Sequence, residues 1–180
     1  MTTPTTTRPL AGRLTRVAGQ IGDQYSRGTG QPLRGYVTTM AAYTAVIGAL
    51  SGAAAASGRE IPQDGPSPFD VLLLSAATYK ISRLLTKDPV TSPLRAPFTA
   101  YAGPGGPGEL SEEVRIGGEG QAIGELVTSP FSASVWVATG LTAGLVFLPG
   151  LTRLVTGTFA ALAGTDLLHF GHDWLARVAS

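Results

Sequence analysis

Two long stretches of this chain carry no charged side chain. The first runs for 24 residues from Gly35 to Gly58, and the second for 27 residues from Leu126 to Thr152. A membrane's hydrocarbon core is about 30 Å thick, so about 20 helical residues at 1.5 Å each cross it. Both stretches are long enough to do so, and the sequence predicts an integral membrane protein.

The overall composition agrees with this interpretation and excludes some functions. Charged residues make up 14% of the chain, well below the usual quarter. The 13 basic and 12 acidic residues nearly cancel, so there is no basic footprint for a nucleic acid. The sequence contains no cysteine, which excludes a disulfide and a thiolate nucleophile.

The N-terminal arm, residues 1–34, differs from the rest of the chain. It contains five arginines and no long hydrophobic run, which favours a disordered segment. Leu10, Leu14, Val17 and Ile21 have approximately helical spacing, so a short helix lying on the membrane surface is an alternative.

The membrane domain, residues 35–180, contains four candidate helices. Ser67 precedes Pro68 and Asp70 follows, an arrangement typical of a capped helix start. Ser129 and Pro130 repeat this signal. We predict an all-α, integral membrane four-helix bundle with spans at about 36–57, 67–87, 130–148 and 151–170. The alternative has two spans, with the second and fourth helices at the membrane surface.

Small residues and flanking charges predict packing and orientation. Gly48 and Gly52, and likewise Gly140 and Gly144, are four residues apart, so each pair forms a face that another helix can approach closely. Lys and Arg gather in the N-terminal arm and between the second and third helices. Because cytoplasmic loops are enriched in these residues, we expect an inner (plasma) membrane protein with both termini in the cytoplasm.

The polar loop, residues 88–128, connects the second and third helices on the cytoplasmic side. We expect an extended or turn-like segment at 91–98, a flexible Gly-Pro segment at 103–108 and one helical turn at 111–114. Residues 122–128 are predicted to form a short amphipathic helix. At about forty residues the loop is too long for a plain connector.

The first candidate site is a cluster of basic residues at the end of the second helix. Lys80, Arg83 and Lys87 fall on one helical face, and we expect Asp88, Arg95 and Glu125 to fold back on them. Such a cluster could bind an anionic head group or line an anion path. The alternative is a stripe of basic side chains that extend to the membrane interface, neutralised by Asp88 and Glu125.

The second constellation lies in the fourth helix. Asp166, His169 and Asp173, with His172 nearby, have the spacing of metal ligands on a helix. The same pattern is typical of a helix emerging into water, and we prefer that interpretation. We therefore expect no metal and no cofactor. We also expect no catalytic residue, because no nucleophile is paired with His169.

Two motifs carry a family resemblance. The segment 79–98, from Tyr79-Lys-Ile-Ser-Arg to Arg-Ala-Pro-Phe98, and the segment Gly124-Glu-Leu-Val-Thr-Ser-Pro-Phe-Ser132 followed by Val135-Trp-Val137 resemble DUF1360, an uncharacterised family of bacterial membrane proteins. The resemblance covers roughly residues 67–165. It implies a small multi-span membrane protein with no known activity.

One position departs from the family pattern. Members of the family typically have Cys-Pro-aromatic-Cys where this chain has Ser129-Pro-Phe-Ser132. A thiol pair at a helix N-terminus could bind metal or cycle redox, whereas serine hydroxyls can do neither. Ser129 is sufficiently explained as a helix cap.

The functional hypothesis follows from these features. We expect a non-enzymatic membrane scaffold or assembly factor whose polar loop 88–128 binds a protein partner or a lipid head group. The lipid bilayer is its environment, and a second copy of the chain is a further possible partner. The alternative is a small anion channel or transporter lined by Lys80, Arg83 and Arg95.

Overall fold

The computed structural model describes residues 31–58 and 65–179, together with residues 16–17, 19–22, 24–25 and 27. The predicted disordered or surface-lying arm, residues 1–34, falls largely outside the described residues. The same is true of the connection at 59–64.

Two helices carry the strongest membrane signal. α2 spans Leu33–Ala56 and α6 spans Pro130–Phe147. Both are long and apolar enough to cross a membrane, and only 6% and 0% of their most apolar windows are buried. The core helix of a water-soluble domain would instead hide such a surface. Among the described helices only these two meet that standard of length and hydropathy.

The other two long helices are α3, Pro68–Lys87, and α7, Pro149–Ala179. α3 starts with the predicted capping box: Ser67 Oγ accepts from the Asp70 backbone N–H at 3.1 Å, and Asp70 Oδ2 accepts from the Ser67 N–H at 3.2 Å. α7 has 31 residues and continues well beyond the predicted end at 170. No proline follows residue 170, and Leu175 and Ala176 favour helix.

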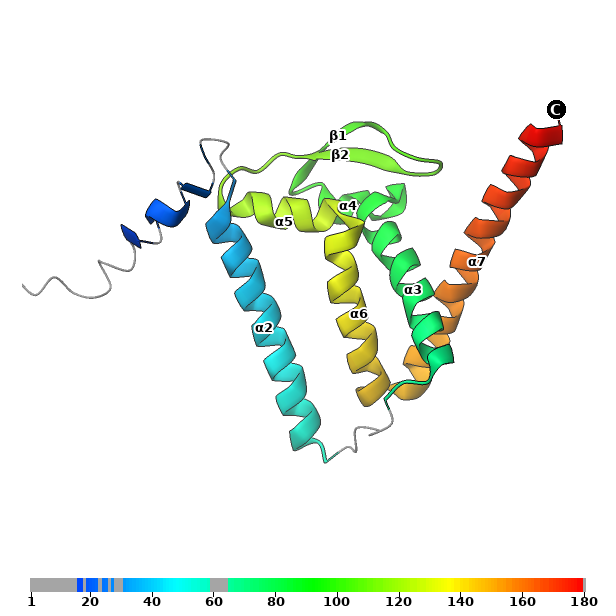
Figure 1. The fold of residues 1–180 in the computed structure, drawn as a ribbon, viewed down its shortest axis with the longest axis horizontal. Coiled ribbons are helices and arrows are strands. Elements are labelled where there is room, and N and C mark those ends of the chain that lie inside the picture. The colour runs from blue at the N-terminus through cyan, green and yellow to red at the C-terminus, as the bar shows by residue number, and fades with distance from the viewer. Residues whose placement is uncertain are drawn as a thin grey trace, which may run out of the picture.

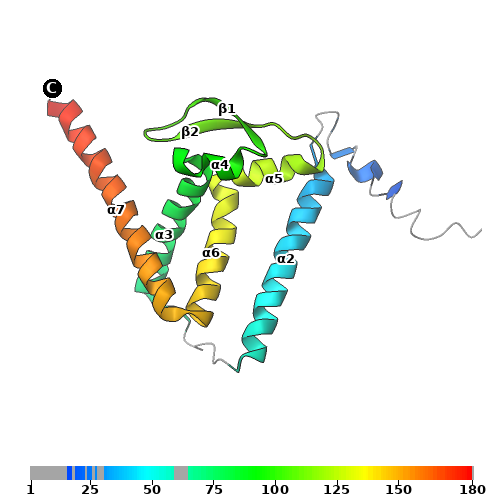
Figure 2. The same ribbon diagram turned by 180° about the vertical axis from the view of Figure 1, so that it is seen from behind.

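The long helices run up and down alternately (Figures 1 and 2). The start of α2, the end of α3, the start of α6 and the end of α7 lie at one end of the molecule. α3 packs against both α6 and α7, whereas α2 contacts α6 more sparsely. Cavities of about 350 and 340 Å³ lie along the α2–α6 boundary. Between them Tyr43 bonds to Thr139 at 2.9 Å and meets the Trp136 ring edge-on, with centroids 5.2 Å apart.

The polar loop folds into a cap over the start of α2, the end of α3 and the start of α6 (Figure 1). It contains η1 (Pro89–Thr91), α4 (Ser92–Arg95), β1 (Thr99–Pro104), β2 (Leu110–Val114) and α5 (Glu119–Thr128). Hereafter the cap means residues 88–128. The predicted helix at 122–128 lies within α5. The segment 91–98, predicted to be extended or turn-like, is helical at Ser92–Arg95 and forms a turn at 96–98.

The β-hairpin in the cap corrects the all-α prediction. β1 and β2 pair antiparallel, with Thr99 opposite Val114 and Tyr101 opposite Glu112. The segment 111–114, predicted as a helical turn, is therefore a strand. Gly103 and Gly108 have φ angles of 139° and 73°, which glycine adopts without strain. They let the Gly-Pro segment reverse the chain, so that two short polar segments pair.

The small-residue faces pack less than predicted. A Cβ added at Gly48, Gly52 or Gly140 would meet nothing within 4 Å, so these positions make no close helix contact with any described residue. Gly144 is different, because a Cβ there would lie 2.5 Å from Thr152 Oγ1. Close approach thus occurs where α6 turns into α7, and not along α2.

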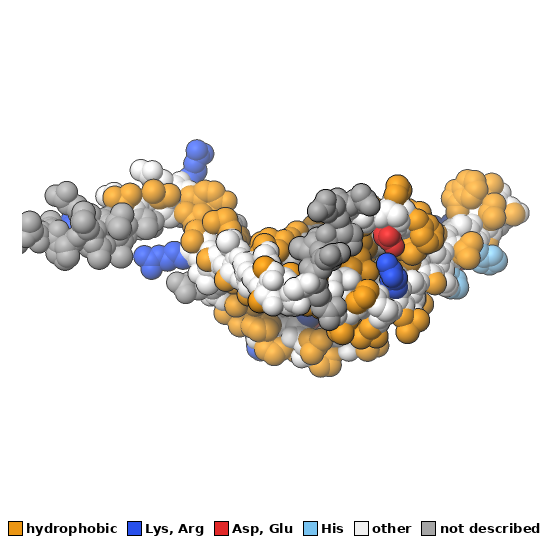
Figure 3. Space-filling view, turned by 90° about the horizontal axis from the view of Figure 1, so that it is seen from below, with side chains coloured by type: hydrophobic (Ala, Val, Ile, Leu, Met, Phe, Trp, Pro, Cys, Tyr) orange, Lys and Arg blue, Asp and Glu red, His pale blue; other side chains and the backbone are white. Residues whose placement is uncertain are grey.

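The described part of the chain buries few large apolar side chains. Its buried hydrophobic residues are all alanines, and many leucines, valines and phenylalanines are exposed. Figure 3, which views the end opposite the cap, shows apolar side chains spread over the helix ends. The exposed apolar side chains along the helices are suited to contact with lipid.

Candidate functional site

The two clusters that the sequence presents separately meet between α3 and α7. Lys80 of α3 donates from Nζ to both carboxylate oxygens of Asp166 of α7, at 2.9 and 2.7 Å. Their side chains are 24% and 32% exposed. A residue of the predicted basic cluster is thus paired with a residue of the predicted metal candidates.

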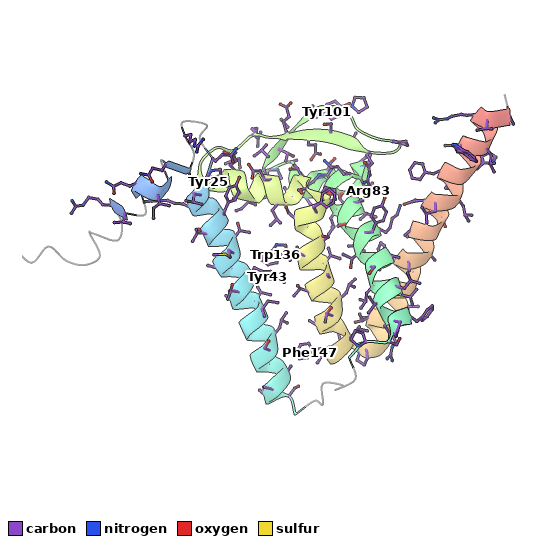
Figure 4. All side chains as sticks on the ribbon, in the orientation of Figure 1. Tyr25, Tyr43, Arg83, Tyr101, Trp136 and Phe147 are labelled. Carbon is purple, nitrogen blue, oxygen red and sulfur yellow. The ribbon has the colours of Figure 1, made fainter. Side chains whose placement is uncertain are left out.

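A second ion pair joins α3 to the hairpin. Arg83 donates from Nε to Glu109 Oε1 at 2.8 Å and from Nη2 to Oε2 at 2.6 Å. This parallel geometry is the strongest form of a carboxylate–guanidinium contact. The guanidinium carbon also lies 5.6 Å from the centre of the Tyr79 ring, within the range of a cation–π contact. Figure 4 places Arg83 near the cap end of α3.

These pairs border a cavity of about 330 Å³, which we call the acidic pocket. Four carboxylates and two cations line it, so negative charge is in excess by two when His169 is neutral. The remaining wall is formed by aromatic, aliphatic and hairpin residues. The lining comprises Tyr79, Lys80, Arg83, Leu84, Asp88, Pro107, Gly108, Glu109, Asp166, His169, Phe170 and Asp173.

Arg95 is predicted as a site residue, but it lies inside the cap. It is 1% exposed and does not line the acidic pocket. Its Nε donates to Glu112 Oε2 at 2.7 Å and its Nη2 to Oε1 at 3.0 Å. Nη1 donates to the Leu85 carbonyl at 2.9 Å and to Thr91 Oγ1 at 2.6 Å. With every nitrogen engaged, Arg95 connects the end of α3, α4 and β2.

The contacts inside the cap determine the ionisation of Glu112. Its side chain is 8% exposed, and it also accepts from Ser92 at 3.0 Å and Thr99 at 3.2 Å. The hydrogen bonds from Arg95 lower the pKa of the Glu112 carboxyl below its usual value of 4.5, although burial acts in the opposite direction. The carboxylate is therefore held ionised inside the cap.

Asp88 and Lys87 lie at the end of α3. Asp88 Oδ1 accepts from the Val90 N–H at 2.8 Å, and its carbonyl accepts from Arg95 Nη2 at 3.1 Å. Asp88 thus starts η1 and also lines the acidic pocket. Lys87 is the last residue of α3 and does not line the pocket, and within the described residues no ion pair involves it.

Glu125 does not fold back on the basic cluster, contrary to expectation. It lies on α5 and accepts from the Tyr36 hydroxyl at 2.6 Å and from Gln121 Nε2 at 2.9 Å. Because Tyr36 is in the first turn of α2, Glu125 ties that helix to the cap. The physical reason is the position of α5, which lies beside the start of α2 and away from the acidic pocket (Figure 1).

The structure brings only three of the four candidate metal ligands to the acidic pocket. Asp166, His169 and Asp173 line the acidic pocket, and His172 does not. Within the described residues no three His, Asp or Glu side chains are grouped closely enough to hold a metal ion. Ser129 accepts from the Ser132 backbone N–H at 3.3 Å, the geometry of a helix cap.

Glu109 and Glu112 are missed by sequence reasoning. Each pairs with an arginine that the sequence does single out, and each lies on or next to β2. The only local signal is the Gly-Pro segment at 103–108 between two polar stretches, which is compatible with a hairpin turn.

Fold and site together define a predominantly helical protein with two helices of membrane-crossing length and a folded polar cap. Residues 73–172 match the family described as protein of unknown function (DUF1360), and the chain belongs to that family. This confirms the resemblance identified in the sequence. The match runs from α3 through the cap and α6 to α7 and leaves α2 outside. No curated protein and no solved structure matches the chain.

Proposed function

We propose that the chain is a non-enzymatic, four-span membrane scaffold whose cap is a docking platform for a protein partner. The observation that carries this proposal is the buried Arg95–Glu112 pair, which fastens the hairpin to the end of α3. A segment that only linked two helices would not need a buried ion pair. A platform needs a fixed shape.

The proposal includes membrane crossing by α3 and α7. A single basic or acidic group at the bilayer centre costs about 2.5–3.5 kcal/mol on insertion scales. Lys80 and Asp166 neutralise each other at 2.7 Å, so neither enters the membrane as a free charge. Lys80 is also 12 residues from Pro68, or about 18 Å along the helix, which places the pair toward the cap side.

The proposed orientation puts the cap and both termini in the cytoplasm of a bacterial cell, with the helices in the inner (plasma) membrane. On the cap side the described helix ends and cap carry Arg34, Lys87, Arg95 and Arg115, whereas Arg153 lies at the opposite end. This asymmetry supports the orientation because basic residues are retained on the cytoplasmic side.

Exposed apolar side chains on the cap support a protein partner. Val90, Leu94 and Tyr101 are 84%, 66% and 68% exposed. Tyr101 lies on the hairpin, away from the helices (Figure 4). Aromatic and aliphatic side chains of this kind are enriched at the centres of protein interfaces.

The charges of the acidic pocket argue against the alternative function, an anion channel or transporter. Lys80 and Arg83 each already have a carboxylate partner, and Arg95 is enclosed in the cap. The remaining carboxylates would repel an entering anion. The proposal includes no catalytic step.

Reporter fusions test the topology. We expect cytoplasmic signals from fusions at both termini and at Gly106 in the hairpin, and periplasmic signals at Gly65 and Gly150. A cytoplasmic signal at Gly65 together with one at Gly150 would replace four spans with a surface-bound arrangement. A periplasmic signal from either terminus would reverse the orientation.

Site-specific photocrosslinking in native membranes tests docking. A benzophenone side chain at Tyr101 should give one protein adduct of defined mass. The same group at Leu162, an exposed position on α7, serves as the matched control and should give no adduct of that mass. The adduct should also be lost when Glu112→Gln loosens the cap. An adduct that persists with Glu112→Gln, or none at Val90, Leu94 and Tyr101, would contradict the platform.

A further inference from the structure

Arg83 stands between two cavities of opposite character. One is the acidic pocket on the α7 side of α3. The other is a groove of about 460 Å³ between α3 and α6, which we call the outer groove. Both cavities are lined by Tyr79 and Arg83, so these two residues form the boundary between them.

The outer groove has the shape and chemistry of a site for a hydrocarbon chain. Val71, Leu74, Phe131 and Ala138 contribute to its walls, and Arg83 is its only charged residue. From Val71 to Arg83 the groove follows α3 for 12 residues, or about 18 Å. That length is close to one leaflet of a hydrocarbon core about 30 Å thick.

Arg83 can bind a phosphate without losing its ion pair. Nε and Nη2 donate to Glu109, which leaves Nη1 without a hydrogen bond to any described residue. The side chain is 40% exposed. A phosphate oxygen at the top of the groove would accept a charge-assisted hydrogen bond from Nη1.

The neighbouring acidic pocket selects among head groups. Its two surplus carboxylates repel a head group that carries net negative charge and attract a cation attached to the phosphate. Asp173 is exposed at this pocket, and a primary ammonium has three N–H donors for such carboxylates. A quaternary trimethylammonium has none.

We propose that the outer groove and the acidic pocket together bind a zwitterionic phospholipid with a primary ammonium, phosphatidylethanolamine. The acyl chain occupies the outer groove, the phosphate bonds to Arg83, and the ammonium enters the acidic pocket toward Asp173. This inference rests on the membrane location in the proposed function and does not depend on a protein partner.

Lipid titration of the purified chain in detergent tests the proposal. Phosphatidylethanolamine, phosphatidylcholine and phosphatidylglycerol with identical acyl chains are added, and bound lipid is counted by native mass spectrometry. We expect phosphatidylethanolamine to bind about tenfold more tightly than the other two, since tenfold corresponds to about 1.4 kcal/mol, the scale of one charge-assisted hydrogen bond.

Two variants locate the site. Asp173→Asn should remove most of the preference for phosphatidylethanolamine over phosphatidylcholine, and Arg83→Gln should weaken binding of all three lipids. Glu113→Gln and Arg115→Gln, which change exposed charges on the cap, are matched controls and should bind as the wild type does. If Arg83→Gln unfolds the chain, Asp173→Asn alone decides the question.

Two results would overturn the proposal. One is equal binding of the three lipids or a preference for phosphatidylglycerol. The other is a preference for phosphatidylethanolamine that Asp173→Asn leaves intact. Failure of the membrane assignment would appear separately, in the reporter fusions, and failure of docking in the photocrosslinking.

Discussion

Arg95 and Glu112, 17 residues apart, form two parallel hydrogen bonds of 2.7 and 3.0 Å in the interior of the cap. At 1% relative exposure Arg95 is the largest fully buried side chain in the described residues. Among the described residues, the largest fully buried side chain is therefore a charged one. It lies in a segment that the sequence predicts to be a polar loop.

Removing the charge of Glu112 should destabilise the protein strongly. Glu112→Gln leaves the buried Arg95 without a counter-ion, and breaking a buried pair costs about 3–5 kcal/mol. Glu113→Gln is the matched control, because Glu113 is the next residue on β2 and is exposed. Its effect should be under about 1 kcal/mol. Unfolding in mild detergent measures both, and similar losses for the two variants would show that the pair does not hold the cap.

The same pair predicts a pH dependence. Arg95 lowers the pKa of the folded-state Glu112 carboxyl below 4.5, so the unfolded chain binds its proton first as the pH falls. The stability that Glu112 contributes is complete above about pH 4.5 and is lost as the pH falls through the lower folded-state pKa. The difference in unfolding free energy between wild type and Glu112→Gln should therefore shrink on acidification. A difference that stays constant between pH 7 and pH 3 would contradict this.

Arg83 and Lys87 should differ in importance although they lie one helical turn apart. Arg83→Ala removes a bidentate contact with Glu109, but Arg83 is partly exposed, so we expect a loss of about 1 kcal/mol. Arg83→Lys should recover little of it, because an ammonium cannot supply two parallel donors. Lys87→Ala should have almost no effect.

A double-mutant cycle isolates the interaction with Glu109. Arg83→Ala and Glu109→Ala should be less than additive in the unfolding free energy, since either change alone breaks the same pair. Additive losses of unfolding free energy would contradict the Arg83–Glu109 pair. Equal and small losses for Arg83→Ala and Lys87→Ala would also contradict it, and Arg83 would then be only a basic side chain that extends to the membrane interface.

The two glycines of α6 should respond differently to the same substitution. Gly144→Ala places a Cβ 2.5 Å from Thr152 Oγ1, and overpacking of this kind typically costs about 1–3 kcal/mol. Gly140→Ala meets open space and should be neutral or stabilising by up to about 1 kcal/mol, because alanine is the better helix former. Thermal unfolding of both variants is the measurement. Destabilisation by Gly140→Ala would indicate a close helix contact beyond the single chain.

Local signals predict much of the helical architecture. The starts of α3 and α6 follow from Ser67-Pro68 and Ser129-Pro130, because a cap and a proline act within one turn. Lys80, Arg83, Asp166 and His169 are all singled out by residue type and helical spacing. The sequence does not predict that these residues line one pocket, because this depends on α3 packing beside α7. Lys80 and Asp166, for example, are 86 positions apart, and no local pattern connects them.

The cap shows where such reasoning stops. Ser111-Glu-Glu-Val114 has no strong preference for helix or strand, and its strand conformation is fixed by pairing with β1 across the Gly-Pro turn. The partners of Arg83 and Arg95 depend on that pairing as well. Charge alone predicts Glu125 among the basic residues, whereas its position on α5 brings it to Tyr36.

α2 lies outside the family match, which begins at residue 73. It is joined to the rest at its cap end by Tyr36 and Glu125 and midway by Tyr43, with cavities along its boundary with α6. Few contacts thus hold α2 to the rest of the described structure, whereas α3 packs extensively on both α6 and α7. Substitutions on the exposed faces of α2 should therefore disturb the packing of α3, α6 and α7 very little.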